Sequence, residues 1–362
     1  MGLNELGGLR SVRRRDGSAS DEEQKAESFN RRDLLRSVTL AGTAGLLGLQ
    51  PHAVCAEPPP ETTRLRIKRD AGLLCEAPAQ VAEELLRVEG FSEVQYVWTF
   101  GADGILEKTV AGEIDLALIT ALPAIRWIEA GEPLVILAGI HVGCFELIAR
   151  EPVRTIRDLK GKVVAVSYLG GTAHLLTAIM AASVGLNPQQ DIEWAVQGGN
   201  REAMQYFIDG RADAFMGFPP EPQELRTRKI GQVVVSMTAD RPWSQYFCCL
   251  LMASRTFVRK HPVATKRALR ALLKANDVCA LAPETTAQRM VDRGYTERYD
   301  LALKVIKEIP YGQWRQYDAE DTVRFFALRL REVGMLKSTP QQIIARGTDW
   351  RFLNELKKEL KG

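Results

Sequence analysis

From residue 64 to about residue 138, the chain alternates between short apolar runs and amphipathic segments. Alternating or continuous apolar residues predict strands, and apolar residues recurring at helical spacing predict helices. The runs at 115–119 and 134–138 are almost wholly apolar, as strands covered on both faces of a sheet require. The predicted strands of this part are 65–68, 94–98, 115–119 and 134–138, and the predicted helices are 77–89, 103–111 and 123–130.

The same rhythm restarts near residue 159 and gives way to helices later in the chain. Strands that alternate with helices favour parallel α/β sheets, so the pattern predicts two α/β units of similar construction. From about residue 276 onward the pattern is mostly helical. The predicted strands are 163–166, 192–196, 212–216 and 231–235, and the predicted helices are 173–184, 200–208, 264–281, 319–333 and 340–345.

Residues 1–56 carry the marks of an export signal. A charged region with Arg31-Arg32 precedes the apolar run 38–49, and small residues follow at 54–56, the order typical of a signal peptide. The paired arginines before Leu34-Leu35 resemble a twin-arginine signal. We therefore expect cleavage after Ala56, a periplasmic location reached by the twin-arginine route, and a linker at 57–63. The alternatives are a disordered N-terminus with one helix and a lipoprotein anchored through Cys55.

Composition excludes several classes of protein. Lys and Arg number 48 against 45 Asp and Glu, and a net charge of +3 without a basic, aromatic-rich stretch argues against nucleic-acid binding. Four His and six scattered Cys offer little for a metal site, so no metal and no cofactor is expected. The five Cys after residue 56 are either small buried apolar residues or include one long-range disulfide.

Two kinds of sequence string carry a family resemblance. Residues 156–166 read Ile-Arg-Asp-Leu-Lys-Gly-Lys-Val-Val-Ala-Val and are followed by Gly170-Gly171-Thr172-Ala173; the related strings 112–118 and 208–215 each combine a helix end, a glycine and a strand. This pattern resembles periplasmic solute-binding proteins of ABC transporters, in the class that takes up nitrate, taurine, other sulfonates and thiamine-pyrimidine precursors. The resemblance covers nearly all of residues 64–281.

The resemblance implies a type II periplasmic-binding-protein fold, which has two α/β lobes, a ligand cleft between them and here a helical C-terminal extension. Lobe 1 would hold residues 64–145 and 242–362, and lobe 2 residues 146–241. The lobes would close on the ligand about a hinge. The implied partners are a small-molecule ligand and an ABC permease, with no nucleic acid and no membrane contact except through the permease.

Candidate ligand-binding residues follow the carboxyl ends of the predicted strands, where open α/β sheets bind ligands. Gly170-Gly171-Thr172 is the sharpest candidate, because glycines admit a ligand close to the backbone and Thr172 would cap a helix whose free N–H groups attract anions. Gly199-Asn200 is a weaker example, with Asn200 as the cap. Both are also compatible with ordinary glycine-rich turns.

Other candidates come from the same loops. Glu76 would pair with a ligand amine or merely complement a helix dipole, and His141, in a loop with Gly143, would donate to a ligand oxygen or serve the loop alone. Phe218 and Trp243 would stack on a flat ligand or belong to the core. Thr120 and Leu169 complete the predicted set. Arg241 is the one loop arginine that could pair with an anion, whereas Glu76 argues against a purely anionic ligand. The charge of the ligand therefore stays open.

Two other functions compete with solute binding for transport. One is a ligand-sensing module that docks on a signalling receptor. The other is an enzyme similar to thiamine-pyrimidine synthase, whose Cys-rich iron-binding string is only faintly echoed by Phe247-Cys248-Cys249-Leu250. No nucleophile triad, paired-carboxylate motif or dinucleotide glycine fingerprint is present, so the sequence predicts a protein that is not an enzyme.

Overall fold

The computed structural model describes residues 57–70, 73–99 and 101–360. The predicted signal peptide lies outside them, so export remains a prediction. Residues 57–63 carry no regular secondary structure before the first strand. Glu61 nevertheless accepts hydrogen bonds from the backbone N–H groups of Val263 and Ala264, each at 2.9 Å, at the start of helix α10 (Pro262–Leu281). The predicted linker is therefore docked on α10 and not simply solvated.

The first sheet has five strands in the order β2-β1-β3-β10-β4. β1 pairs in parallel with β2 and β3, whereas β10 runs antiparallel to β3 and to β4. β4 and β10 are buried over their whole length. The strands are β1 (Arg64–Arg69), β2 (Glu93–Trp98), β3 (Leu116–Thr120), β4 (Leu134–Val142) and β10 (Phe247–Ser254).

The second sheet has the order β7-β6-β8-β5-β9. β6 is parallel to β7 and β8, whereas β5 is antiparallel to β8 and β9. The strands are β5 (Glu146–Ala149), β6 (Lys162–Val166), β7 (Ile192–Val196), β8 (Ala214–Gly217) and β9 (Gln232–Ser236).

The expectation of parallel sheets is wrong for both sheets. Each contains one antiparallel strand that the sequence pattern did not reveal: β5, which follows the passage from the first sheet to the second, and β10, which follows the return. Both are buried over their whole length, so they show no alternation of polar and apolar residues. A buried apolar run between loops is hard to assign without its tertiary partners.

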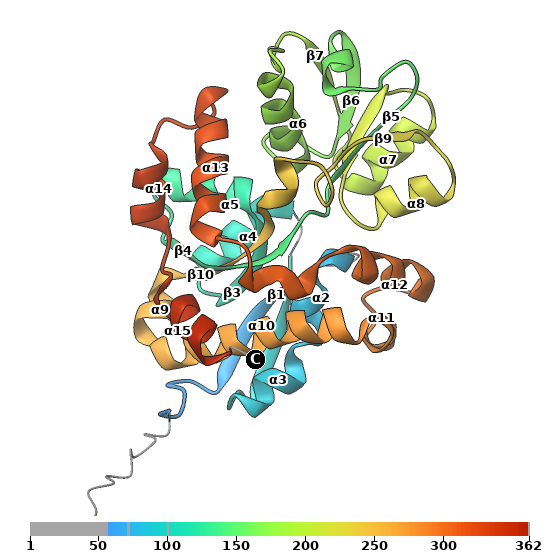
Figure 1. Cartoon of the computed structure of the whole chain (residues 1–362). Coiled ribbons are helices and arrows are strands. Elements are labelled where there is room, and N and C mark those ends of the chain that lie inside the picture. Colours follow the sequence, from blue (N-terminus) through green and yellow to red (C-terminus); the bar gives the residue numbers. More distant parts are fainter. Residues whose placement is uncertain (1–56, 71–72, 100, 361–362) are drawn as a thin grey trace, which may run out of the picture. The chain divides into compact units, whose positions relative to one another are not determined.

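Helices flank both sheets (Figure 1). The predicted helix 77–89 is divided into two short helices that follow a 3-10 turn, and α8 was not predicted. The helices up to the end of the second sheet are η2 (Leu74–Glu76), α2 (Ala77–Val81), α3 (Glu83–Val88), α4 (Gly101–Val110), α5 (Ala121–Glu129), η3 (Ile156–Leu159), α6 (Thr172–Ser183), α7 (Asn200–Ile208) and α8 (Glu221–Thr227).

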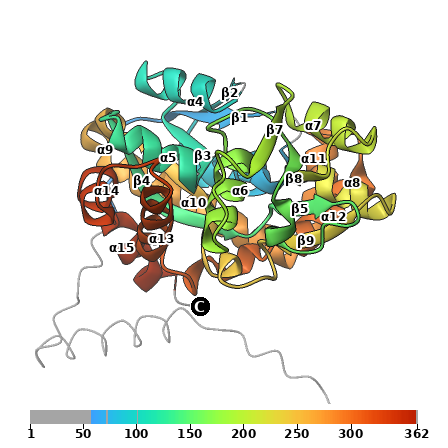
Figure 2. The same cartoon turned by 90° about the horizontal axis from the view of Figure 1, so that it is seen from above.

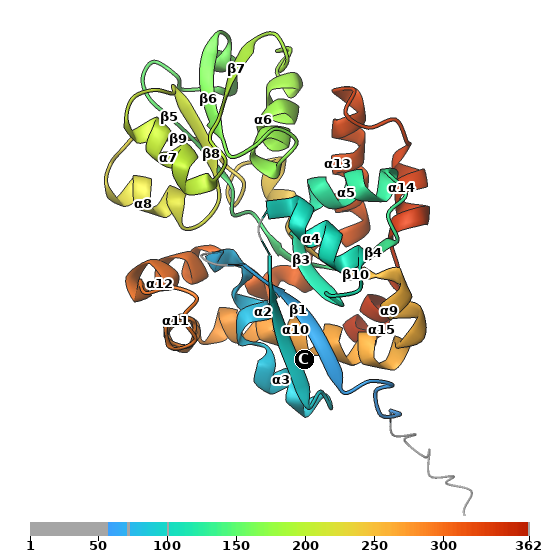
Figure 3. The same cartoon turned by 180° about the vertical axis from the view of Figure 1, so that it is seen from behind.

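The C-terminal part is helical, as predicted, and returns to the first sheet. α10 packs on α2 and α3, and α13 packs on α5 and α14. α12 reaches α8 of the second sheet, and α6 lies beside α5 and α13 (Figures 2 and 3). These elements are η4 (Trp243–Gln245), α9 (Arg255–Lys260), α10, α11 (Pro283–Asp292), α12 (Tyr299–Glu308), η5 (Tyr311–Arg315), α13 (Ala319–Glu332), α14 (Pro340–Gly347) and α15 (Arg351–Glu359).

A large apolar core runs from the first sheet into the inner face of the second, and a smaller one lies under α7 around Phe207 and Phe215. Among the described residues, no helix combines the length and apolar character needed to cross a membrane.

Candidate functional site

A pocket of about 670 Å³ lies where strands of both sheets end. The first sheet and its helices contribute the ends of β1 and β3, the start of α4 and the turn η2. The second contributes the loops after β6, β7 and β8. The charged and polar residues that line it are Lys68, Asp70, Glu76, Thr120, Ser167, Tyr168, Thr172, Asn200, Arg201, Glu202, Glu221, Glu224, Thr296 and Arg298. Its apolar lining includes Leu73, Leu74, Ile105, Ile119, Pro123, Phe145, Phe218 and Leu301.

Half of the sequence-predicted ligand residues line this pocket, namely Glu76, Thr120, Thr172, Gly199, Asn200 and Phe218. They come from five separate segments of the chain. The structure therefore brings together residues that the sequence could only nominate loop by loop.

Two helices of the second sheet begin at the pocket. The first residues of α6 and α7, Thr172 and Asn200, belong to the lining. The N-cap positions are Gly171 and Gly199, one residue earlier than predicted, because these glycines already have extended backbone. Glycine brings no capping side chain, so backbone N–H groups at both helix starts are left for water or an anionic group of a ligand.

Contacts across the pocket join the two sheets. Thr120 Oγ1 at the end of β3 lies 2.5 Å from Thr172 Oγ1 at the start of α6. Arg126 Nη1 on α5 donates to the Gly170 carbonyl at 3.4 Å. These contacts hold the glycine-rich turn against the first sheet.

A second set of contacts joins α8 to α12. Arg226 Nη2 lies 2.5 Å from Glu308 Oε2, and Gln223 Nε2 donates to the same oxygen at 3.0 Å. Arg226 also pairs with Glu146 of β5 at 3.1 Å. Lys304 Nζ donates to Thr227 Oγ1 at 3.0 Å. This polar cluster is positioned to hold the two sheets in their observed arrangement.

The floor of the pocket carries a buried ion pair. Lys68 Nζ lies 2.5 Å from Glu76 Oε1 and 3.9 Å from Asp70 Oδ2. Burial lowers the pKa of Lys68, but the two carboxylates outweigh it and raise the pKa above its usual value. Burial raises the pKa of Glu76 to about 8, a shift that Lys68 opposes only in part. At the floor of the pocket, Lys68 is thus paired with Glu76, a carboxyl that is readily protonated.

Glu221 opens α8 and is a second buried carboxyl in the lining. Burial raises its pKa to about 7, while a hydrogen bond with Asn200 and the charge of Arg201 oppose the shift. Its Oε2 atom is buried without a hydrogen-bond partner among the described residues. The carboxyl therefore interacts with the start of α7 and keeps one oxygen without a hydrogen-bond partner among the described residues.

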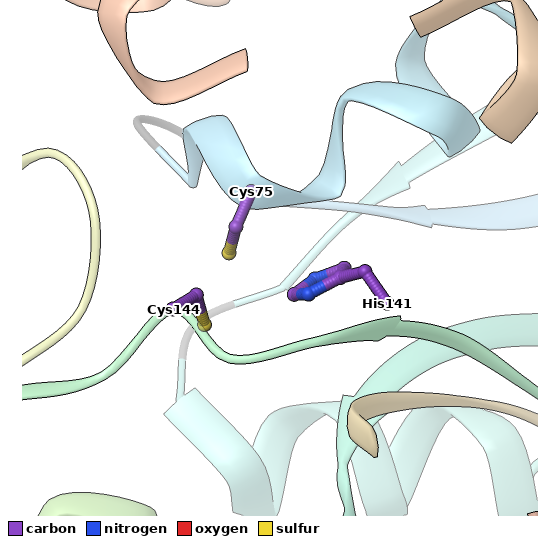
Figure 4. Close-up of side chains that lie close together, drawn as sticks. All are labelled: Cys75, His141 and Cys144. Carbon is purple, nitrogen blue, oxygen red and sulfur yellow. The ribbon is translucent and has the colours of Figure 1, made fainter. Parts of the chain in front are cut away.

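A cluster of cysteine sulfur atoms lies at the same floor. Cys75, Cys144 and Cys249 line the pocket, and Cys144 Sγ lies 3.2 Å from Cys248 Sγ. All four thiols and that of Cys279 are buried and unbridged, as expected for small apolar residues. His141 is 1% exposed behind the floor and packs edge-on against Tyr311. Figure 4 shows the side chains of Cys75, His141 and Cys144 pointing toward one another.

The remaining predicted ligand residues lie outside the pocket. Gly143 packs its backbone against Thr238, and Trp243 is buried with its indole edge-on to Phe325, so the core alternative holds for Trp243. Leu169 and Gly170 line a smaller neighbouring hollow beside Arg126.

Two further predicted residues, Gly171 and His141, lie behind the residues that line the pocket. A side chain at Gly171 would meet the ring of Tyr168, which does line the pocket, and His141 lies beneath the floor. Arg241 is exposed and is not part of the lining.

Sequence reasoning missed Lys68, Arg201 and Glu221. Lys68 looked like an exposed residue of an alternating strand, and only the fold places Glu76 beside it. Arg201 directly follows the predicted Asn200. Its place in the first turn of a helix that begins at the pocket could have nominated it as a ligand residue. Glu221 lies three residues after the predicted Phe218, but nothing in the local sequence indicated that its carboxyl is buried.

The fold and the pocket define a protein built from two α/β lobes with a ligand-sized cavity at the strand ends of both. The chain belongs to the NMT1-like family, whose sequence model matches residues 73–293, more than half of the chain. No curated protein matches the chain.

Solved structures share the fold. The periplasmic nitrate-binding protein NrtA from Synechocystis PCC 6803 is 17% identical, with 84% of this chain and 90% of that chain covered and a TM-score of 0.72. The alkanesulfonate-binding protein SsuA from Xanthomonas axonopodis pv. citri is 17% identical, with 80% and 99% covered and a TM-score of 0.64.

A Candida albicans protein described as having the generic periplasmic binding protein structural fold is 13% identical, with 79% and 96% covered and a TM-score of 0.63. The predicted resemblance is confirmed at the level of family and fold.

Proposed function

We propose that the mature chain is an extracytoplasmic solute-binding protein that captures a small organic solute and delivers it to an ABC permease. The pocket of about 670 Å³ carries this proposal, because both lobes line it and two uncapped helix starts point into it. The NrtA and SsuA structures are described as binding proteins, which supports a binding role and not a catalytic one.

The size and lining of the pocket favour an organic solute over nitrate alone. Pockets of roughly 300–1,000 Å³ suit metabolite-sized ligands, and nitrate would leave most of this volume to water. The helix starts, Lys68 and Arg201 suit an anionic group such as a sulfonate or carboxylate. Glu221 and the apolar lining suit a second, neutral or hydrogen-bond-donating part of the same molecule.

The two sheets support the proposed division into lobes. Lobe 1 comprises residues 64–145 and 242–362, lobe 2 comprises residues 146–241, and the cross-lobe contacts at Thr120 and Glu308 would form as the lobes close. Processing after Ala56 and twin-arginine export would place this mature chain in the periplasm beside its permease.

A ligand screen tests the proposal. The chain from residue 57 onward is scanned by thermal shift against sulfonates, carboxylates, aromatic acids, pyrimidines and nitrate, since a ligand that binds the folded state raises the unfolding temperature by mass action. Native mass spectrometry of protein from its host checks for solute carried through purification. We expect an organic anion to bind with 1:1 stoichiometry.

A matched pair of variants assigns the binding to the pocket. Asn200→Ala removes an amide from the lining at the start of α7, whereas Asn354→Ala removes an exposed amide on α15, outside the pocket lining. Affinity should fall at least about tenfold in the first and stay unchanged in the second. Binding that is insensitive to Asn200→Ala, or the absence of any bound solute in both assays, would count against the proposal.

A further inference from the structure

Three side chains from two separate segments converge beneath the pocket floor. Cys75 comes from the turn η2, His141 comes from the end of β4, and Cys144 comes from the loop that follows β4. One donor atom from each lies within 4.8 Å of the other two, and all three residues are buried. Figure 4 shows both sulfur atoms and the imidazole ring directed at the same space.

The imidazole is oriented to present a lone pair. His141 Nδ1 lies 3.3 Å from the Val142 carbonyl oxygen, so a proton on Nδ1 is the arrangement that makes this hydrogen bond. Nε2 is then unprotonated, and it is buried without a hydrogen-bond partner among the described residues. A buried acceptor without a partner is costly unless something occupies the space in front of it. A backbone carbonyl on the far ring nitrogen is also the usual support of a metal-bound histidine.

We propose that Cys75, His141 and Cys144 form a binding site for a thiophilic divalent cation, zinc(II), at the floor of the pocket. Two thiolates and one neutral imidazole are a ligand set that zinc accepts, with a fourth position left open. The charge also balances: a divalent ion with two thiolates and a neutral imidazole is electrically neutral, which a buried site favours. Binding replaces the two thiol protons, which pass to solvent.

The geometry requires only a local adjustment. Donor atoms around a tetrahedral zinc lie about 3.5–3.8 Å apart, given bonds of about 2.3 Å to sulfur and 2.0–2.1 Å to nitrogen, so the site must contract by about 1 Å. Cys75 and Cys144 line the pocket, so the fourth position is open to a donor from that side.

Metal titration of the reduced, metal-free chain from residue 57 onward tests the site without any solute. Cobalt(II) should produce thiolate-to-metal charge-transfer absorption, and zinc should displace it with one ion per chain and release about two protons. Zinc should also shield Cys75 and Cys144 of the unaltered protein from alkylation, mapped by peptide mass spectrometry. Free-thiol titration first establishes that Cys144 and Cys248 are reduced.

Matched cysteine variants locate the ion. Cys75→Ser and Cys144→Ser should each lower zinc affinity by about 100-fold or more, above the loss typical of a residue that only supports a ligand. Cys279→Ser alters a thiol that is equally buried but outside the cluster and should bind like the unaltered chain. Thermal unfolding confirms that each variant folds.

Three results would overturn the site. They are binding of less than one zinc ion per reduced chain, a loss of zinc affinity in Cys279→Ser as large as in Cys75→Ser, and alkylation of Cys75 and Cys144 that zinc does not slow. Loss of zinc in Cys248→Ser with retention in Cys75→Ser would place the ion elsewhere and refute this assignment.

Discussion

The Glu76→Ala substitution removes the principal partner of a lysine at the floor of the pocket. Lys68 is 3% exposed and Glu76 is 5% exposed, and their charged atoms lie 2.5 Å apart. Breaking a buried ion pair by deleting one member costs about 3–5 kcal/mol, because the remaining charge stays desolvated. Asp70 still faces Lys68 at 3.9 Å, and water from the pocket can fill the vacated volume. We therefore expect a loss near the lower limit, about 3 kcal/mol.

Equilibrium unfolding in urea at about pH 9 measures this loss, because the Glu76 carboxyl, whose pKa is raised to about 8, is ionised there. An exposed ion pair provides the control. Lys307 and Glu284 lie 2.7 Å apart, but both side chains are more than half exposed. Glu284→Ala should cost far less than Glu76→Ala, because water already solvates both charges. Replacing Lys68 and Glu76 together with Met and Leu should cost much less than Glu76→Ala, because no unpaired charge remains.

Two outcomes would refute this reasoning. If Glu76→Ala costs no more than Glu284→Ala, Lys68 is solvated well enough that burial does not matter. If the double variant is as unstable as the single one, the loss comes from packing and not from an unpaired charge.

Three further predictions concern closure, the glycine-rich turn and pH. Gly171→Leu should lower solute affinity at least about tenfold in calorimetry, because its Cβ would lie 2.5 Å from the ring of Tyr168 in the pocket wall. Gly104→Ala is the control and should bind the solute normally, because the added Cβ meets nothing within 4 Å. Glu308→Gln should raise the solute dissociation rate about two- to fivefold in stopped flow, since its pair with Arg226, whose side chains are 31% and 32% exposed, joins the lobes. An unchanged rate would remove that pair from closure. The pKa of Glu76, raised by burial from 4.5 to about 8, means that the folded state holds a proton that the unfolded state has lost, so stability should fall as pH rises from about 5 to about 8. The unfolding free energy of Glu76→Gln should lack this decline, and identical pH profiles would contradict the prediction.

The sequence by itself determined the local elements and the family. Apolar periodicity reports which face of a segment is buried, so helices such as α6, α7 and α10 and strands such as β6 and β7 were predicted within a few residues. Glycines before Thr172 and Asn200 marked two helix starts, because Gly170 and Gly198 have positive φ, which glycine adopts without strain. These signals are local, and the family strings are local as well.

Tertiary structure alone decided which groups meet. β5 and β10 are buried throughout, so only their partners show that they run antiparallel and make the sheets mixed. Lys68 reads as a surface residue until the fold places it against Glu76, and Cys75 reads as an isolated thiol until β4 brings His141 and Cys144 to it. The physical reason is that charge pairing and metal ligation depend on distances of a few ångströms between segments far apart in the chain, and strand register, not local pattern, sets those distances.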